Sequence, residues 1–170
     1  NHLSKISIWG NVDDSIVKKG QVLANSVCFA RDLGNHPANI LTPNYFANES
    51  KRISKAKNMK CTVYDVSKFE KMGLGSFYGV ARGAKEPAKM IIVEYNGGPK
   101  KQKPVALVGK GLTFDTGGIS LKPGARMDEM KFDMCGSATV MGVMNAVSIL
   151  QPKINIIFAI GSTENMPGSD

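Results

Sequence analysis

Cysteine and histidine are scarce in this chain of 170 residues. It has three cysteines, Cys28, Cys61 and Cys135, and two histidines, His2 and His36. The cysteines are odd in number, widely spaced and without a Cys-x-x-Cys motif, which argues against a disulfide framework and against a thiolate zinc site. A metal ion held by this chain must therefore be bound by oxygen atoms or by an unusual donor. Three free thiols favour a reducing compartment, so the sequence predicts a cytoplasmic protein.

Long apolar runs are also lacking. No stretch approaches the run of about 18 apolar residues that a membrane-spanning helix needs, so we expect no membrane span. The 18 glycines and 8 prolines are too few for a fibrous or low-complexity chain. The first residue is Asn1 and not Met, which favours a piece of a longer product.

Aromatic residues make up only 7% of the chain and do not interleave with its basic clusters, as a single-strand nucleic-acid binder requires. The net charge of +8 is unevenly distributed. Residues 1–104 carry 17 basic and 8 acidic side chains, whereas residues 105–170 carry 5 and 6. We interpret the basic half as a solvated surface, with a polyanion-binding patch as the alternative.

The spacing of apolar residues predicts strands alternating with helices. Strands are expected at 5–9, 60–66, 89–95, 105–108 and 154–160, and helices at 16–34, 43–56, 67–72 and 136–150. In the first helix the apolar face that we expect to point inward consists of Ile16, Leu23, Val27 and Ala30. This alternation predicts an α/β fold with a mixed, mostly parallel sheet and helices on both faces.

A glycine-rich segment, residues 109–124, follows the predicted strand 105–108. Its five glycines accompany Lys110, Asp115 and Lys122. In open α/β sheets, functional groups collect at the carboxyl ends of strands. The segment contains neither the GxxxxGK[ST] nor the GxGxxG pattern, which makes a phosphate-binding loop the weaker interpretation.

A metal site is the other interpretation of this segment. Asp115 and Asp133 can both face the crevice at the strand ends, where divalent cations accept carboxylate ligands. Lys110 can join them only if its amine is kept neutral. A purely structural role is also open, with Asp133 as a favourable charge at a helix N-terminus and with Asp128 and Glu129 solvated.

Two segments resemble a known family. Residues 108–122 read Val-Gly-Lys-Gly-Leu-Thr-Phe-Asp-Thr-Gly-Gly-Ile-Ser-Leu-Lys, and residues 127–136 read Met-Asp-Glu-Met-Lys-Phe-Asp-Met-Cys-Gly. Together they closely resemble the catalytic domain of the leucyl (cytosol) aminopeptidases, with the specific spacing Lys-x4-Asp-x6-Lys-x10-Asp. Residues 30–43 and the Glu-Asn-Met-Pro at 164–167 are similar to other stretches of that domain. The resemblance implies that residues 16–170 are the N-terminal part of an incomplete metallo-aminopeptidase catalytic domain, preceded in 1–15 by a linker or the tail of another domain.

The resemblance also implies roles for individual residues. Asp115 would bridge two divalent ions, Zn²⁺ or Mn²⁺, and Lys110 and Asp133 would complete the site that also takes the substrate's α-amino group. Lys122 would bind no metal and would stabilise the oxyanion as the catalytic residue. Met130 would line the pocket for the first side chain. These five residues would thus form the substrate-binding set.

The activity implied by the resemblance is hydrolysis of N-terminal amino acids, with a leucine-type, apolar preference, by attack of a metal-activated hydroxide. Peptides with a free N-terminus would be the substrates, and the assembly would be a homo-hexamer. Because ligation requires a deprotonated Lys110, metal affinity is expected to decrease as the pH is lowered.

One motif of the family is missing from the chain. The sequence Asn-Thr-Asp-Ala-Glu-Gly-Arg is absent from the 170 residues. In the family it supplies an Asp and a Glu to the metals, and an Arg associated with a bound bicarbonate. We therefore expect the complete enzyme to be active and this piece alone to be inactive. The alternative is a non-catalytic relative that binds nucleic acid through the basic half, and a phosphate-binding domain is the weakest interpretation.

Overall fold

The computed structural model describes residues 5–168. His2 and the first residues of the predicted N-terminal tail lie outside them. In chain order the elements are α1 (Asp14–Asn35), α2 (Pro43–Ile53), β1 (Met59–Asp65), a 3₁₀ turn (Val66–Lys68), α3 (Gly75–Ala81), β2 (Lys89–Asn96), β3 (Val105–Asp115), a second 3₁₀ helix (Met127–Phe132), α4 (Cys135–Leu150) and β4 (Asn155–Asn165).

The four strands form one mixed sheet in the order β1-β2-β4-β3. β1 pairs with β2 and β2 with β4 in antiparallel fashion, and β3 pairs with β4 in parallel. The mixed α/β sheet is thus confirmed, but parallel pairs do not predominate in the part of the chain that is described. An apolar run indicates that a strand is buried, but it does not indicate whether the strand is parallel or antiparallel to its neighbour. Parallel neighbours need a long crossover connection, and among the paired strands only β3 and β4 are joined by one, through α4.

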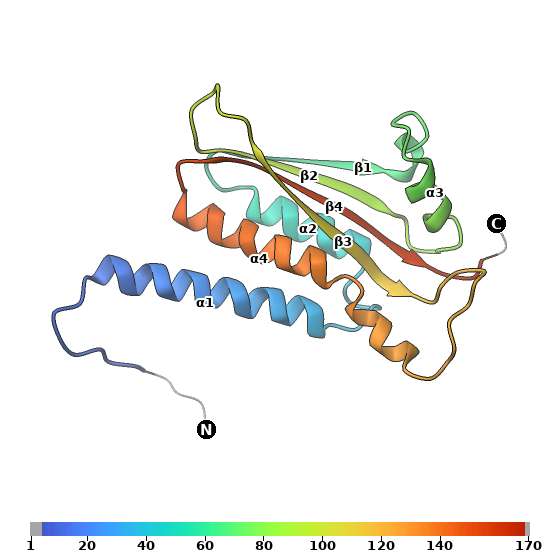
Figure 1. The fold of residues 1–170 in the computed structure, drawn as a ribbon, viewed down its shortest axis with the longest axis horizontal. Helices are drawn as coiled ribbons and strands as arrows, with labels where there is room; N and C mark the ends of the chain where they lie inside the picture. Colours follow the sequence, from blue (N-terminus) through green and yellow to red (C-terminus); the bar gives the residue numbers. More distant parts are fainter. Residues whose placement is uncertain (1–4, 169–170) are drawn as a thin grey trace.

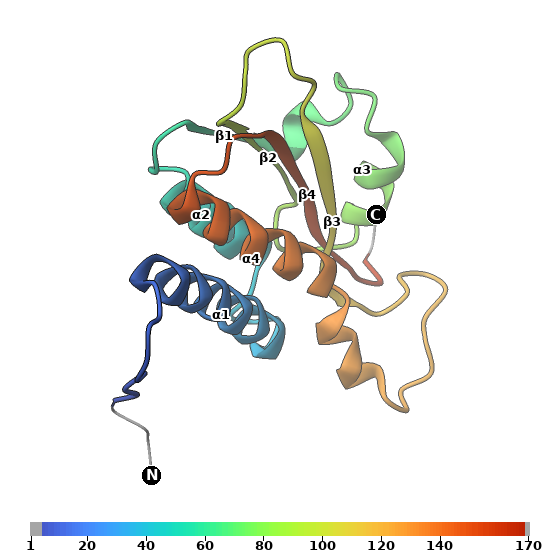
Figure 2. The ribbon, with the colours of Figure 1, turned by 60° about the vertical axis from the view of Figure 1, so that its left-hand side comes forward.

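Helices cover both faces of the sheet, as predicted (Figures 1 and 2). α2 and α4 pack on one face, where Phe46, Met141 and Phe158 belong to the main apolar core. α3 packs on the other face near the end of β4, with Phe69 and Ala88 in a smaller core. α1 packs on α4 and forms an outer layer. The sheet is therefore covered on both faces near the end of β4.

The N-terminus of α2 forms as its sequence predicts. The hydroxyl of Thr42 accepts a hydrogen bond from the backbone N–H of Tyr45 at 3.2 Å, and Pro43 occupies the first helical turn. Ser, Thr, Asp or Asn at this position satisfies a donor that the helix leaves unpaired, and proline lacks that donor altogether. Phe46 and Ile53 are buried on its inner face, whereas Ala56 lies beyond the helix end.

One helical stretch, Met127–Leu150, is long and apolar enough to cross a membrane by length and composition alone. Half of its most apolar window is buried inside the fold. Its main part, α4, lies between the sheet and α1 (Figure 2). Because α4 packs on both sides, it is a core helix of the fold, and this explains its apolar composition.

Several predicted elements differ from the structure. β4 continues to Asn165 and does not end at 160, and the helical stretch expected at 67–72 is only a 3₁₀ turn at Val66–Lys68. Residues 5–9 form no strand, and Trp9 is 90% exposed, because their alternating pattern has no partner strand in the described chain. β3 continues to Asp115 and does not end at 108, so half of the predicted glycine-rich loop is strand. α3 was not predicted, since its two glycines and short length give no helical periodicity.

Candidate metal centre

Asp115 ends β3 and is held by its surroundings. Its Oδ1 accepts hydrogen bonds from the backbone N–H of Gly117 at 2.9 Å and from Asn165 Nδ2 at 2.7 Å. Its Oδ2 contacts the ammonium of Lys122, which also donates to the Asp115 carbonyl at 3.3 Å. Burial acts to raise the pKa of the carboxyl, but the hydrogen bonds it accepts outweigh that effect and hold the pKa below its usual value. Asp115 is therefore a fixed carboxylate at the strand end.

Asp133 forms the second ion pair of the site. Its Oδ1 lies 2.9 Å from Lys110 Nζ, with the Asp133 side chain 22% exposed and that of Lys110 59% exposed. The other oxygen, Oδ2, is buried and has no hydrogen-bond partner among residues 5–168. A buried carboxylate oxygen without a partner carries a desolvation cost, and a bound cation would remove it.

The glycines of β3 bring that strand against the N-terminus of α4. A Cβ at Gly109 would lie 2.7 Å from the Cα of Ser137, and one at Gly111 would lie 2.8 Å from the Ser137 hydroxyl oxygen. From the helix side, a Cβ at Gly136 would lie 3.1 Å from the backbone nitrogen of Lys110. This close approach sets Asp133, just before α4, beside Lys110 on β3. The glycines that suggested a loop instead allow strand and helix to touch.

The turn after β3 brings Lys122 back to Asp115. Gly117 and Gly118 have positive φ values of 92° and 68°, which favour glycine. The backbone N–H of Lys122 then donates to the carbonyl of Thr116 at 2.9 Å. This closed turn explains how two residues seven positions apart form an ion pair.

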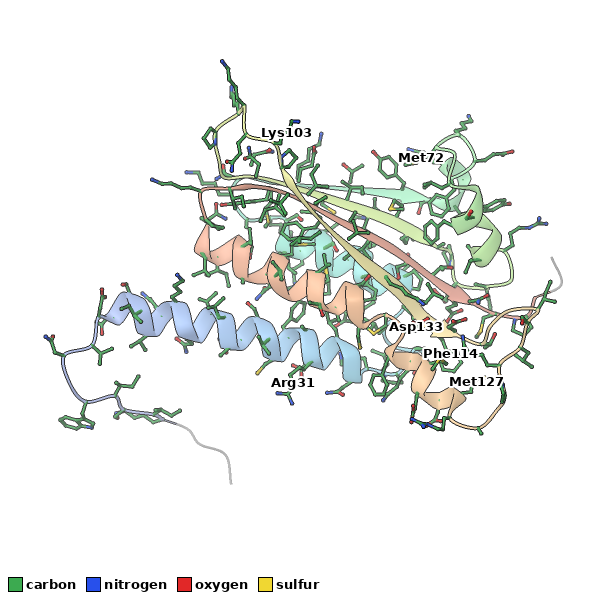
Figure 3. All side chains as sticks on the ribbon, viewed as in Figure 1. Arg31, Met72, Lys103, Phe114, Met127 and Asp133 are labelled. Atoms are coloured by element: carbon green, nitrogen blue, oxygen red, sulfur yellow. The ribbon has the colours of Figure 1, made fainter. Side chains whose placement is uncertain are left out.

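The structure thus joins four of the predicted residues in two pairs, Asp115 with Lys122 and Lys110 with Asp133. No ion pair or hydrogen bond connects one pair to the other in the described chain. Met130 lies half-buried in the 3₁₀ helix before Asp133, and its carbonyl accepts the Asp133 N–H at 3.3 Å. In Figure 3, Asp133 and Phe114 are labelled at the end of the molecule where β3 stops, and Lys103 at the opposite end. The basic loop 97–104 is therefore remote from this site.

Asn165 is the residue of this site to which the sequence assigned no role. It ends β4 as the register partner of Asp115 and donates to that carboxylate. The only signal was its place in the Glu-Asn-Met-Pro segment at 164–167. Pairing between β3 and β4 brings these positions together across 50 residues, and local sequence does not report such a contact.

The donor atoms at this edge fit part of a divalent metal site. Two carboxylates and one amine are available, and Asp115 Oδ2 is already in contact with a cation. Zinc and manganese both accept such donors. No group of three or more His, Cys, Asp or Glu side chains gathers as a metal site between residues 5 and 168. The donor atoms present at this edge are therefore fewer than a complete metal site needs.

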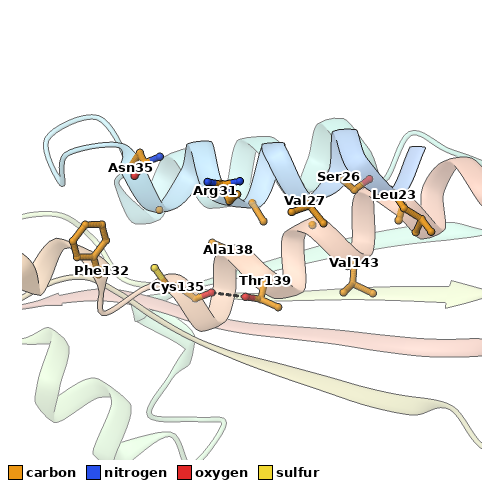
Figure 4. A pocket seen from close by; sticks show the side chains of 14 residues that line it. Leu23, Ser26, Val27, Arg31, Asn35, Phe132, Cys135, Ala138, Thr139 and Val143 are labelled. Carbon is orange, nitrogen blue, oxygen red and sulfur yellow. Dashed lines mark hydrogen bonds between the residues drawn. The ribbon is translucent and has the colours of Figure 1, made fainter. Parts of the chain in front are cut away.

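A separate apolar groove of 580 Å³ runs between α1 and α4 (Figure 4). Leu23, Val27 and Val143 line it, together with Phe132 and Cys135 near the start of α4. Leu23 and Val27 were expected in the core, yet they are 46% and 57% exposed. Ser26, Leu33 and Gly34 are the buried residues of α1 instead. Burial, aided by the charge of Asp133, raises the pKa of the Cys135 thiol, which disfavours the reactive thiolate.

Comparisons with known proteins agree with this architecture. The chain is 52% identical over 152 residues to a probable cytosol aminopeptidase of Nitrosococcus oceani, covering 89% of this chain and 30% of that protein. It is 46% identical over 171 residues to a probable cytosol aminopeptidase of Pseudomonas paraeruginosa, covering 97% and 34%. The chain thus spans about a third of the length of the curated relatives it matches.

A solved structure shows the same fold. The bottromycin maturation enzyme BotP in complex with Mn matches with a TM-score of 0.84 and 34% identity, over 94% of this chain and 34% of that chain. The model of the catalytic domain of the cytosol aminopeptidase family matches residues 28–170. The residues that the family model matches include the end of β3 and both ion pairs. The chain belongs to the cytosol aminopeptidase family, and residues 28–170 are part of its catalytic domain.

Proposed function

We propose that the protein carrying this chain is a di-metal aminopeptidase that removes N-terminal amino acids from peptides. The observation that carries the proposal is the arrangement of two carboxylate–lysine pairs, each with one member on β3, in a chain of this family. The sequence relatives are named probable cytosol aminopeptidases, and one structural relative was solved in complex with Mn. Two ions per subunit, Zn²⁺ or Mn²⁺, are part of the proposal.

Asp115, Lys110 and Asp133 are the residues of this chain that would hold the ions. Asp115 is proposed as the bridging ligand, because its carboxylate is held in place at the end of β3. Lys110 and Asp133 would serve one ion, and the unpartnered Oδ2 of Asp133 supports that assignment. Bound divalent ions supply Lewis acidity, which activates water at neutral pH and polarises the peptide carbonyl.

Lys122 is proposed as the catalytic residue. Its ammonium lies at the Asp115 carboxylate, and its side chain remains 34% exposed. It can therefore donate a hydrogen bond to a carbonyl oxygen bound at this edge and stabilise the negative charge that develops there. An ammonium group at this place has the positive charge that such a role requires.

Recognition of the substrate is proposed to start at its α-amino group. The Lys110–Asp133 side of the site would take that amine, which makes the enzyme cleave from the N-terminus. Met130, half-buried next to Asp133, would line an apolar pocket for a leucine-type side chain. The Arg and bicarbonate expected of the complete enzyme would complete the site. We propose a cytoplasmic location, in line with the name cytosol aminopeptidase of the relatives, and a homo-hexameric assembly.

Replacement of Asp115 tests the proposal. In the full-length protein, Asp115→Ala should abolish hydrolysis of leucine amide, and a chelator should abolish the activity of the wild type reversibly upon addition of Mn²⁺. Asp128→Ala is the matched control, since Asp128 is exposed and lies outside both ion pairs. Near-normal activity of Asp115→Ala would refute the assignment. The matches to aminopeptidases do not favour the nucleic-acid-binding alternative.

A further inference from the structure

The carboxylate of Asp115 is asymmetric in its contacts. Oδ1 accepts two N–H donors, from Gly117 at 2.9 Å and from Asn165 at 2.7 Å. Oδ2 contacts only the Lys122 ammonium among the hydrogen bonds of the described residues. An ionised carboxylate has about two acceptor positions on each oxygen. Both positions of Oδ1 are thus used by neutral donors, and Oδ2 is the oxygen left for cations.

Asn165 is itself held from two sides. Its carbonyl accepts the N–H of Thr116 at 2.9 Å and the Thr116 hydroxyl at 2.8 Å. Its side-chain oxygen lies against Gly118, where a Cβ would approach to 2.7 Å. The amide must present its N–H₂ group to Asp115, because an oxygen there would repel the carboxylate. Strand register and turn therefore fix the direction of the donated hydrogen bond.

We infer that Asn165 is a positioning residue, which orients Asp115 so that Oδ2 faces the metal ions. This inference rests on the proposed function and deepens it. Without the amide, Gly117 alone holds Oδ1, and the carboxyl can rotate about the Cβ–Cγ bond. Partners that orient a metal ligand commonly contribute about 10- to 100-fold to metal affinity or activity. Asn165 acts through Asp115 and needs no contact with the ions.

Two substitutions test the inference in the full-length protein. Asn165→Ala removes the amide, and Asn165→Leu removes it while keeping a side chain of similar volume. We expect both variants to bind Mn²⁺ about 10- to 100-fold more weakly in titration calorimetry. With Co²⁺ as the probe, we expect an altered visible absorption spectrum, because the geometry around the ion changes. We also expect kcat to fall more than KM rises.

Asn155→Ala is the matched control. Asn155 lies at the other end of β4, and its amide holds the loop 97–104 through Gly98, Pro99 and Gln102. This variant should lose stability without changing Mn²⁺ affinity or the Co²⁺ spectrum. Wild-type metal affinity and spectrum in both Asn165 variants would overturn the inference. So would an equal loss of affinity in Asn155→Ala, which would indicate general damage to β4. A wild-type protein without metal-dependent aminopeptidase activity would instead refute the proposed function.

Discussion

At the scale of single residues, Lys122 carries the sharpest catalytic prediction. We expect Lys122→Met in the full-length protein to lower kcat by about 10²- to 10³-fold, as loss of one oxyanion donor does. Metal affinity should be retained, because this residue is proposed to bind substrate and not metal. Steady-state kinetics and a Mn²⁺ titration measure the two quantities separately.

Lys131→Met is the control for that prediction. Lys131 lies in the 3₁₀ helix Met127–Phe132, with its ammonium 4.8 Å from the centre of the Phe132 ring, and it does not contact Asp115. The same change of side chain there should leave kcat nearly unchanged. Loss of Mn²⁺ binding in Lys122→Met, with kcat otherwise normal at saturating metal, would contradict the oxyanion role.

Glu164 gives a prediction about pH and stability. Burial, with the nearby charge of Glu86, raises the pKa of its carboxyl. The ionised form is therefore disfavoured in the folded state, and this penalty is present at neutral pH. It is relieved as the pH falls through the raised pKa and vanishes below the unfolded value of about 4.3. Glu164→Gln should thus stabilise the protein at pH 7, with a gain that shrinks towards pH 4.

Denaturant unfolding at several pH values measures this effect. Glu86→Gln should give a smaller gain with the same pH dependence, because Glu86 is the second cause of the shift and burial is the first. A gain independent of pH, or a loss at pH 7, would show that the Glu164 charge does not destabilise the fold.

At the scale of elements, the contact between β3 and α4 depends on the absence of side chains. A Cβ at Gly109 would meet backbone atoms of Ser137 at 2.7 and 2.9 Å, which a rotamer change cannot relieve. Gly109→Ala should therefore destabilise the protein by about 1–3 kcal/mol, as overpacking does. It should also displace Asp133 from Lys110. Thermal unfolding and Mn²⁺ titration test the two effects.

Gly124→Ala is the matched control, since a Cβ there meets no atom within 4 Å. Its unfolding temperature should stay close to that of the wild type. Equal unfolding temperatures for Gly109→Ala and the wild type would mean that α4 can shift without cost.

The elements also show what the sequence could predict. The start of α2 was predicted correctly because Thr42 and Pro43 act within one turn of chain. The position of β2 was predicted correctly because the four apolar residues 90–93 are consecutive. The predicted end of β3 at residue 108 was wrong. Gly109 and Gly111 lie in the strand because α4 packs closely on them, and α4 begins 20 residues after β3 ends in the sequence. The same limit applied to Asn165. The family resemblance predicted roles for Lys110, Asp115, Lys122 and Asp133, but which of them pair with each other depends on the fold around β3.

At the scale of the whole molecule, charge and chemistry lie at opposite ends of the sheet. The loop 97–104, with three lysines, connects the end of β2 to the start of β3, whereas Asp115 stands at the end of β3. The basic residues of that loop therefore cannot contribute to the proposed site. Their place at the far end agrees with a solvated surface, and it separates any polyanion binding from catalysis.

The number of available metal ligands decides whether the 170 residues can act as an enzyme alone. Asp115, Asp133 and Lys110 are the ligands that we propose for them, and no third carboxylate, cysteine or histidine joins them among residues 5–168. A site with so few ligands should bind Mn²⁺ weakly, and ions without a full coordination shell do not position water and substrate together. We therefore expect the isolated chain to hydrolyse no leucine amide at saturating Mn²⁺, whereas the full-length protein does so in a chelator-sensitive manner. Robust chelator-sensitive turnover by the isolated chain, with its mass confirmed as 18.3 kDa, would mean that these three residues suffice for a working site.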